Sequence, residues 1–292
     1  MKNRAFRLDE AKRQGEKLAE EEGCTSFPVD LNAIADKRDI LIEKIGDAKP
    51  GVSAMLLRDG NSFGIFYSTA IPSRGFQRFS IAHELGHYFL EGHIDQIPYD
   101  DSGFHASKAG GFSRDVYEQE ADSFASGLLM PAKLYRRALN GFEDGLVGVK
   151  ALADLCQTSL TATAIRYAEL TEAASAIIIS TGKTVDFACL SPAMKGFAGL
   201  TWLRPGDLLP RGTLTANFNT QRAQFNEDEL GDETDLRLWF DGTRPRNVIE
   251  EVIGLGGYGK TLTIVTCTDT DGDGEDEEEE DSLRESLTPR FR

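Results

Sequence analysis

Hydrophobic positions recur along this chain with two different periods, and the change between them falls near residue 173. Before that point, apolar residues return every three or four positions, as on the buried face of a helix, and Gly or Pro residues stand where such helices can end. The pattern predicts helices over residues 5–22, 74–91, 114–130, 132–138, 147–156 and 160–171, and a turn that opens a short helix within 27–35.

Short apolar runs predict strands in two parts of the chain. The runs 53–58 and 62–68 flank Asp59-Gly60-Asn61, and Asp-Gly readily adopts the positive torsions of a tight hairpin turn. Residues 95–113, rich in Gly, Ser and Asp, are expected to form a loop. After residue 173, β-branched and aromatic runs predict strands over 176–179, 185–189, 236–240, 248–253 and 261–267.

The order of these elements predicts an α+β protein in four parts. We expect residues 1–131 to form a first α+β domain and residues 132–172 to form a helical unit with helix-turn-helix spacing. Residues 173–268 are expected to form a smaller, β-rich α+β domain. Residues 269–292 carry few apolar residues, which predicts a disordered acidic tail.

Composition places the chain among ordinary globular proteins. Of its 292 residues, 40% are apolar and 27% are charged, which suffices for one large core or two smaller ones. No run of eighteen apolar residues occurs, and the charged N-terminal segment does not resemble a secretory signal, so we expect no membrane association. The cysteines show no paired spacing, which favours a cytoplasmic protein with reduced thiols at Cys24, Cys156, Cys189 and Cys267.

The net charge of −16 comes mostly from the acidic tail. Between Asp269 and Asp281, ten of thirteen residues are acidic and none is basic. The rest of the chain is therefore only mildly acidic, and we expect no direct binding of nucleic acid. The oligomeric state stays open.

The residues that can carry chemistry lie in a cluster of histidines. Three of the four histidines fall within eleven residues, and two of them form His83-Glu84-Leu85-Gly86-His87 on the predicted helix 74–91. Residues four apart on a helix differ by about 40° in direction and one turn in height, so both imidazoles can reach one cation. Zinc takes such nitrogen ligands, and Glu84 stands where it can accept a proton from the water that the metal activates.

A catalytic zinc needs a third protein ligand, and His93 is the first candidate. It lies six residues after His87. If the helix continued, His93 would lie about 280° from His83, away from the metal. We therefore favour a loop histidine near the cleft over a ligand.

The better candidates lie on the predicted helix 114–130. Glu118 and Asp122 are four residues apart and share a helix face, so one carboxylate can bind the metal while the other holds a ligand imidazole. Gly86 on the first helix and Ala121 on the second are small, which lets the two helices approach closely. Glu120 points about 200° away from Glu118 and is expected to be an exposed acid.

Both segments resemble a known family. Residues 79–90, around His-Glu-x-x-His, and residues 118–131, Glu-Gln-Glu-Ala-Asp-Ser-Phe-Ala-Ser-Gly-Leu-Leu-Met-Pro, are similar to the ImmA/IrrE family of metallo-endopeptidases, as is the upstream run Phe27-Pro28-Val29-Asp30-Leu31. The resemblance covers about residues 8–172. It implies a zincin-like fold for residues 1–131, with Glu118 as the third ligand in the gluzincin arrangement and Asp122 as the outer residue that supports a ligand.

The resemblance also implies a function. Members of the family cleave helix-turn-helix repressor proteins and so switch on phage, mobile-element or stress-response genes. For this chain it implies one zinc ion on His83, His87 and Glu118, with manganese as an alternative, and Glu84 as the group that moves the proton. Two alternatives stay open: an anti-repressor that displaces the repressor without cleaving it, and a zinc hydrolase that acts on a non-protein substrate.

Other roles in this first domain and beyond it also stay open. Tyr88 and Tyr117 are candidates for a donor to the oxyanion, although packing roles are favoured for both. The run 64–68 precedes the metal helix and is either a strand that pairs with the substrate or an ordinary buried strand. Residues 173–268 serve in sensing, in substrate docking or only in stabilisation.

Three further patterns are weak indications of function. Residues 147–170 have helix-turn-helix spacing, but the segment 161–170 offers only Arg166 as a cation, which favours a structural unit over DNA recognition. Residues 254–261 match the phosphate-loop pattern, yet a β-type run follows them, which predicts a hairpin turn and no nucleotide site. Residues 269–280 match a calcium loop within a run so acidic that the match means little.

Overall fold

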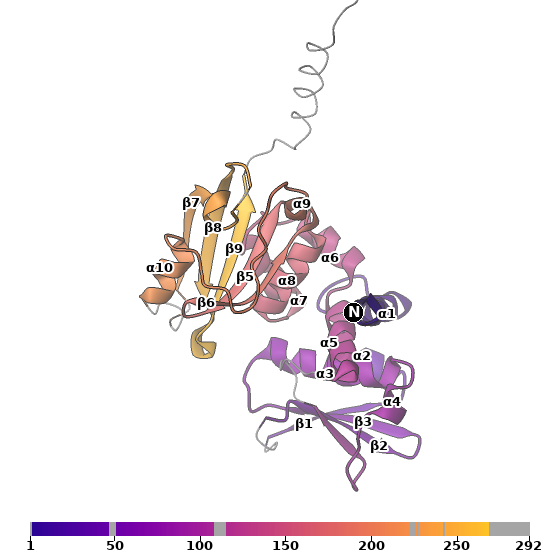
Figure 1. Ribbon diagram of the computed structural model, residues 1–292. Coiled ribbons are helices and arrows are strands. Elements are labelled where there is room, and N and C mark those ends of the chain that lie inside the picture. The colour runs from indigo at the N-terminus through magenta and orange to yellow at the C-terminus, as the bar shows by residue number, and fades with distance from the viewer. Residues whose placement is uncertain are drawn as a thin grey trace, which may run out of the picture. The chain divides into compact units, whose positions relative to one another are not determined.

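The computed structural model describes residues 2–46, 51–107, 115–221, 226, 228–241 and 243–268 (Figure 1). Contacts divide the chain into two compact units, Met1–Glu143 with Val147–Leu170 and Asp144–Leu146 with Thr171–Arg292. The predicted α+β class is confirmed by a mixed sheet with helices in the first unit and an antiparallel sheet in the second. The four-part division stays a prediction. The acidic tail and the calcium-like pattern lie outside the described residues.

The first unit contains a four-stranded sheet with the order β1-β3-β2-β4. β2 and β3 form the predicted antiparallel hairpin, with Gly60 in its turn at φ +60°. β1 pairs with β3 in parallel, and β4 pairs with β2 antiparallel. The strands are β1 (Leu41–Ile45), β2 (Ala54–Asp59), β3 (Ser62–Ser68) and β4 (Phe104–Ser107).

This strand order bears on one open alternative and corrects one prediction. The run 64–68 fits the ordinary buried strand, because β3 is an inner strand whose backbone pairs with β1 on one side and β2 on the other. The stretch 95–113 is not loop throughout, because it contains β4. Among the described residues, β4 pairs with β2 alone and so is an edge strand.

Eight helices are described in or adjoining the first unit, and three of them form its centre. α3 lies against β2 and β3 on one face of the sheet, and α5 packs between α3 and α1 (Figure 1). The helices are α1 (Lys2–Glu21), α2 (Leu31–Asp36), α3 (Arg74–Phe89), α4 (His93–Gln96), α5 (Val116–Leu129), α6 (Ala132–Leu139), α7 (Leu146–Cys156) and α8 (Leu160–Leu170).

Glycines bring these central helices into backbone contact. A Cβ atom at Gly127 would lie 2.0 Å from the Lys12 carbonyl oxygen, and one at Gly15 would lie 2.2 Å from the Phe124 carbonyl oxygen. On the other side of α5, a Cβ at Gly86 would lie 3.1 Å from the Ala121 Cα. Because glycine has no side chain, α5 can lie this close to both α1 and α3.

Arg166, the cation of the helix-turn-helix-like segment, is buried and makes contacts within the fold. Arg166 of α8 is buried, donates from Nε to the Met130 carbonyl oxygen over 3.0 Å, and pairs with Glu169 at 2.8 Å and with Glu16 of α1. Its guanidinium thus joins α1, the end of α5 and α8. This contact set supports the structural reading of the segment, because a buried Arg166 does not face a nucleic acid.

The second unit is built on a five-stranded antiparallel sheet with the order β6-β5-β9-β8-β7. Its core gathers apolar residues of the sheet with Met194, Leu236 and Trp239. The elements are β5 (Ser175–Thr181), β6 (Thr184–Leu190), α9 (Pro192–Lys195), α10 (Leu214–Thr220), β7 (Glu229–Asp235), the 3-10 helix η2 (Leu236–Leu238), β8 (Asn247–Gly254), the 3-10 helix η3 (Gly256–Tyr258) and β9 (Thr261–Cys267).

Two segments of this unit bear on the sequence predictions. The strand predicted over 236–240 is wrong: the chain forms η2 there and buries Leu236, Trp239 and Phe240, whose three- and four-residue spacing suits a helical turn. The turn predicted at 254–261 is confirmed, since β8 and β9 form a hairpin that pairs Gly254 with Thr261.

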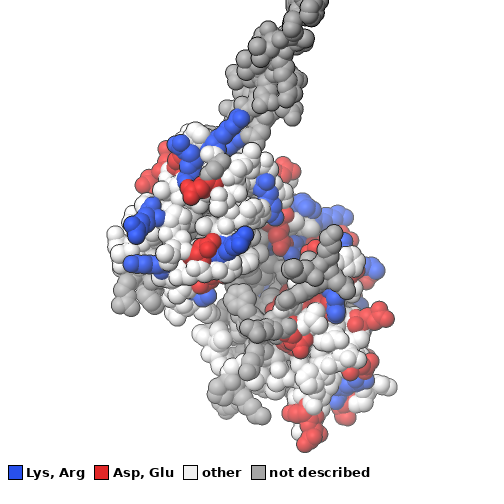
Figure 2. All heavy atoms as spheres, viewed as in Figure 1, with Lys and Arg blue, Asp and Glu red and all other residues white. Residues whose placement is uncertain are grey.

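In the described parts of the chain, neither hydropathy nor surface charge points to a membrane-spanning helix or to a large patch of one charge on the face drawn in Figure 2. None of the helices there combines the length and the apolar character needed to cross a membrane. On the face drawn in Figure 2, the acidic and basic side chains of the described residues are interspersed.

Candidate metal centre

Two histidines of α3 form the base of the site. Ser73 caps the N-terminus of this helix by accepting a hydrogen bond from the Phe76 amide at 3.3 Å. His83 and His87, one turn apart, are both buried, and their Nε2 atoms lie 3.0 Å from each other. The i, i+4 spacing therefore turns both imidazoles to the same point, as the geometry of a helix requires.

Glu118 reaches this point from α5, whose N-terminus is capped by Asp115 through the Tyr117 amide at 2.8 Å. Its Oε2 lies 3.4 Å from His83 Nε2 and its Oε1 lies 3.4 Å from His87 Nε2. One ligand atom from each of these three residues falls within 4.8 Å of the others. The close approach of Gly86 and Ala121 is what brings the carboxylate within reach.

This donor set fits a divalent cation. In a tetrahedral zinc site with bonds of about 2.1 Å, neighbouring ligand atoms lie about 3.4 Å apart, close to the distances seen here. Asp122 Oδ1 lies 2.8 Å from His83 Nδ1 and, being a carboxylate oxygen, accepts a hydrogen bond from its N–H group. With that proton on Nδ1, the neutral form of His83 would offer its Nε2 lone pair to a metal, which is the usual arrangement of a histidine ligand.

Glu84 lies beside this group and is fully buried. Neither of its carboxylate oxygens has a hydrogen-bond partner, and burial raises the pKa of the Glu84 carboxyl. A buried carboxylate without a partner is costly to the fold. Its position next to the candidate ligands fits a group that meets a water or a substrate there.

The pKa values of His83, His87 and Glu118 are shifted by burial and by the charges of their neighbours. Burial lowers the pKa of His83, but its contacts with Asp122 and Glu118 outweigh that effect and raise the pKa to about 10. Burial and the neighbouring His83 lower the pKa of His87 to about 4. Burial would raise the pKa of Glu118, but hydrogen bonds from His105, His83 and His87 hold it well below its usual range. The negative charge of Glu118, which helps to raise the pKa of His83, would equally attract a metal cation.

His93 lies outside the three-residue group but next to it. Gly92, at φ +81°, reverses the chain after α3, so that His93 begins the short helix α4 and is not a loop residue. Its Nδ1 lies 3.2 Å from His87 Nδ1, and its Nε2 lies 3.1 Å from Glu120 Oε2. The prediction that Glu120 is exposed is wrong: its side chain is 7% exposed and pairs with Arg7 of α1.

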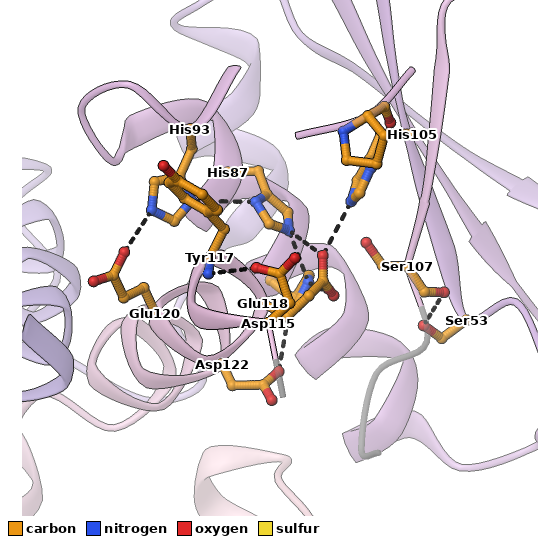
Figure 3. A network of polar contacts seen from close by, with 12 residues as sticks. Ser53, His87, His93, His105, Ser107, Asp115, Tyr117, Glu118, Glu120 and Asp122 are labelled. Atoms are coloured by element: carbon orange, nitrogen blue, oxygen red, sulfur yellow. Dashed lines mark hydrogen bonds and ion pairs between the residues drawn. The ribbon is translucent and has the colours of Figure 1, made fainter. Parts of the chain in front are cut away.

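The fourth histidine, His105, is the residue that the sequence analysis missed. It lies on β4, opposite Leu56 of β2, and its ring turns toward Glu118 and His87 (Figure 3). Its Nε2 lies 3.2 Å from Glu118 Oε1 and its Nδ1 lies 2.9 Å from the Pro98 carbonyl oxygen. The one signal in the sequence was its residue type, because it stands in a stretch expected to be loop.

The two tyrosines considered as oxyanion donors have ring contacts of their own. The ring of Tyr88 packs edge-on against Phe63, with centroids 5.1 Å apart. The ring of Tyr117 packs at 90° against His93, also at 5.1 Å. A third tyrosine, Tyr99, lies near His105 and has a buried hydroxyl without a partner. The packing roles favoured for Tyr88 and Tyr117 agree with these contacts.

Comparison with known proteins adds two findings. Residues 37–167 match the family model Peptidase_M78, described as the IrrE N-terminal-like domain. No curated protein matches the chain. Among solved structures, a Mycobacterium tuberculosis transcriptional regulator is similar, with a TM-score of 0.56 and 14% identity over 93% of this chain and 97% of that one. At that identity the likeness concerns the fold alone.

Proposed function

The chain belongs to the IrrE N-terminal-like domain family through residues 37–167, and on that premise we propose that it is a zinc-dependent endopeptidase that cleaves a helix-turn-helix repressor protein. The observation that carries the proposal is the convergence of His83, His87 and Glu118 beside the buried, unpartnered carboxylate of Glu84. The repressor as substrate rests on the resemblance of the two motifs to the ImmA/IrrE family.

The mechanism assigns a separate task to each side chain. A divalent cation held by His83, His87 and Glu118 would supply Lewis acidity, which activates a water and polarises the scissile carbonyl. Glu84 accepts the proton of the attacking water and delivers it to the leaving amine. Its raised pKa suits a carboxyl that must both take and give a proton. Asp122 keeps the proton of His83 on Nδ1 and so orients the ring.

His105 is assigned the role of a donor to the carbonyl oxygen as it becomes negative. Its Nδ1 contacts the Pro98 carbonyl oxygen and its Nε2 contacts a carboxylate, and both partners only accept, so the doubly protonated ring satisfies both contacts. Burial lowers the pKa of His105, but hydrogen bonds to Glu118 and Pro98 outweigh it and raise the pKa. The Nε2–H group contacts Glu118 Oε1 in the free site, so the assigned role requires it to share or exchange that contact with the carbonyl oxygen as the oxyanion forms.

A peptide substrate is supported by the neighbouring strand. β4 carries His105 into the site and pairs on one side with β2, as the described residues have it. An extended peptide can add to such an edge through backbone hydrogen bonds, which hold its scissile bond at a fixed height relative to the side chains of the strand. This feature favours an endopeptidase over a hydrolase of small molecules.

Glu84→Gln tests the proposal. The substrate is the purified helix-turn-helix repressor encoded nearest to the gene of this chain, and its fragments are identified by mass spectrometry. We expect Glu84→Gln to keep its bound zinc, measured by elemental analysis, and to lose about 10²- to 10⁴-fold in cleavage rate, the usual contribution of a positioned acid–base group. The control, Glu91→Gln, changes an exposed acid just after the same helix and should cleave at the rate of the unaltered chain.

The same pair of variants separates the alternatives in cells. If Glu84→Gln still relieves repression of a reporter as fully as the unaltered chain, the anti-repressor alternative replaces the peptidase. If the unaltered chain, loaded with zinc, leaves the repressor intact, the assignment of the substrate is wrong.

A further inference from the structure

Resting on the proposed metal site, we propose that His93 is a positioning residue for the ligand His87, and that it is itself held in place by Glu120 and Arg7. Its ring nitrogens contact His87 on one side and Glu120 on the other (Figure 3). Arg7 donates in turn to Glu120, so the four residues form a continuous series from α1 to the metal centre. We call Arg7, Glu120, His93 and His87 the outer series.

Hydrogen-bond chemistry allows one proton assignment along the outer series when both rings are neutral. Glu120 Oε2 can only accept, so the 3.1 Å contact requires the proton of His93 to be on Nε2. His93 Nδ1 is then a lone pair, and the 3.2 Å contact with His87 Nδ1 requires the proton of His87 to be on that atom. His87 is thereby left with a lone pair on Nε2, the atom that faces His83 and Glu118.

Arg7 completes the series at its outer end. Its Nη2 donates to Glu120 Oε2 over 2.8 Å and its Nε donates to Oε1, so both carboxylate oxygens are held by one guanidinium. The Arg7 side chain is 42% exposed, whereas those of His93 and Glu120 are 3% and 7% exposed. A buried carboxylate is thus compensated by a cation, and its position is fixed by the planar geometry of the guanidinium.

Packing also limits how His93 can turn. The ring of Tyr117 stands at 90° to the ring of His93 with centroids 5.1 Å apart, and the guanidinium of Arg7 lies 5.8 Å from the Tyr117 ring centroid. Rotation of His93 away from His87 would break its contact with Glu120 and its ring contact with Tyr117. The His93 ring is therefore fixed from several sides.

The two histidine ligands are supported in different ways. His83 contacts the carboxylate of Asp122 directly at 2.8 Å. His87 instead contacts the imidazole of His93, and it is His93 that contacts a carboxylate, that of Glu120. Glu118, Glu120 and Asp122, three acids of a single helix, thus serve respectively as a ligand, as the support of His93 and as the support of His83. The segment 118–122 has a role for each acid that it contains.

The test measures zinc affinity rather than cleavage, so that it stands apart from the test of the proposed function. Zinc dissociation constants are obtained by competition with a chromogenic chelator, and cobalt(II) replaces zinc to give an absorption spectrum of the site. We expect His93→Leu to weaken zinc binding by about 10- to 100-fold, the usual effect of losing an outer partner of a metal ligand, with the four-coordinate cobalt spectrum retained. His93→Asn, whose side-chain oxygen can still accept from His87, should recover part of that loss.

Matched variants control for the fold and for charge. Asp95→Asn alters an exposed acid of the same short helix and should leave zinc affinity unchanged. Arg7→Gln should weaken zinc binding several-fold, because Glu120 loses its cation, whereas Arg13→Gln, on the same helix but paired with Glu10, should not. If His93→Leu fails to fold, the pair Arg7→Gln and Arg13→Gln carries the test.

Two outcomes would overturn the inference. An unchanged zinc affinity in folded His93→Leu, or in Arg7→Gln where that variant carries the test, would mean that the outer series does not support the ligand. A cobalt spectrum in His93→Leu that loses its four-coordinate form would make His93 a direct ligand. A chain that binds zinc with this pattern of affinities but cleaves no repressor would leave the inference standing and would remove the proposed function alone.

Discussion

At the scale of single residues, His105 illustrates how a fixed contact on one ring nitrogen directs the other. The Pro98 carbonyl oxygen holds Nδ1 at 2.9 Å, which points Nε2 toward Glu118 at 3.2 Å. Because the ring is buried on β4, it cannot turn to water instead. The Nε2–H group is thus engaged with the carboxylate of a candidate ligand, and it can serve the substrate carbonyl only by sharing or exchanging that contact.

We predict that His105→Gln lowers kcat by about 10²-fold, the usual effect of losing one donor to an oxyanion. KM should change little, because His105 is not among the three candidate ligands. Zinc is kept in excess, because His105 contacts one of these ligands, Glu118, at 3.2 Å. The measurement is steady-state cleavage of the repressor alongside elemental analysis. Tyr88→Phe serves as the control, since it alters only a hydroxyl on a ring that packs against Phe63. Equal kcat values for His105→Gln and the unaltered chain would contradict the assignment.

The residues of the site that could be predicted are those set by spacing within one helix. His83, Glu84 and His87 follow from the four-residue period, which also places Glu118 and Asp122 on one helix face. The choice of Glu118 as the ligand came from the family resemblance and not from the spacing. Glu120 was misjudged because its partners, Arg7 and His93, are 113 and 27 positions away and only the fold brings them close. His105 could not be found because its strand is defined by pairing with β2, which no local pattern announces.

At the scale of elements, the position of α5 between α1 and α3 decides whether the site exists. The contacts at Gly127 and Gly15 on one side and at Gly86 on the other set the distance of α5 from its neighbours. A carboxylate such as Glu118 has a short reach, so a small outward shift of α5 would separate it from the histidines. The spacing of the helices is therefore a condition of metal binding.

We predict that Gly127→Ala destabilises the first unit by about 1–3 kcal/mol, the range for overpacked sites, although alanine is the better helix former. The added Cβ would lie 2.0 Å from the Lys12 carbonyl oxygen, a backbone atom that cannot move aside easily. Denaturant unfolding measures the loss. Gly46→Ala is the control, because its Cβ would meet nothing within 4 Å and its stability should be nearly unchanged. A stability equal to that of Gly46→Ala would show that the helices can separate at little cost.

The elements that the sequence predicted well are those with strong local signals. The helices α3, α5, α7 and α8 and the β2–β3 hairpin lie within a few residues of their predicted ranges. β1 went unpredicted because it is half exposed, and its parallel partner β3 begins seventeen residues after it ends. η2 was taken for a strand because a run of five residues suits either period.

At the scale of the whole molecule, the two units have separate cores, and the candidate metal centre belongs to the first alone. All the residues of the centre and of the outer series lie within Met1–Glu143. A ligand that binds only the folded state stabilises it in proportion to the logarithm of its concentration, by about 4 kcal/mol at a thousand times its dissociation constant. The effect should be confined to the unit that holds the ion.

We predict that removal of the metal with a chelator speeds amide hydrogen exchange in α3 and α5 and leaves β5, β8 and β9 unchanged. Hydrogen exchange read by mass spectrometry follows both units in one sample. Glu118→Gln, which removes the charged ligand, is the matched control: its exchange should respond much less to zinc or chelator. Equal responses in α3 and α5 and in β5, β8 and β9 would contradict a metal centre that belongs to one unit.

The division of the donors between α3 and α5 has a consequence for the order in which the protein is assembled. α3 alone offers two nitrogen atoms, and the third donor comes only after α5 has settled between its neighbours through contacts that need no ion. We therefore expect the framework of α1, α3 and α5 to form without metal. A chain stripped of its ion should then bind zinc again without being unfolded and refolded.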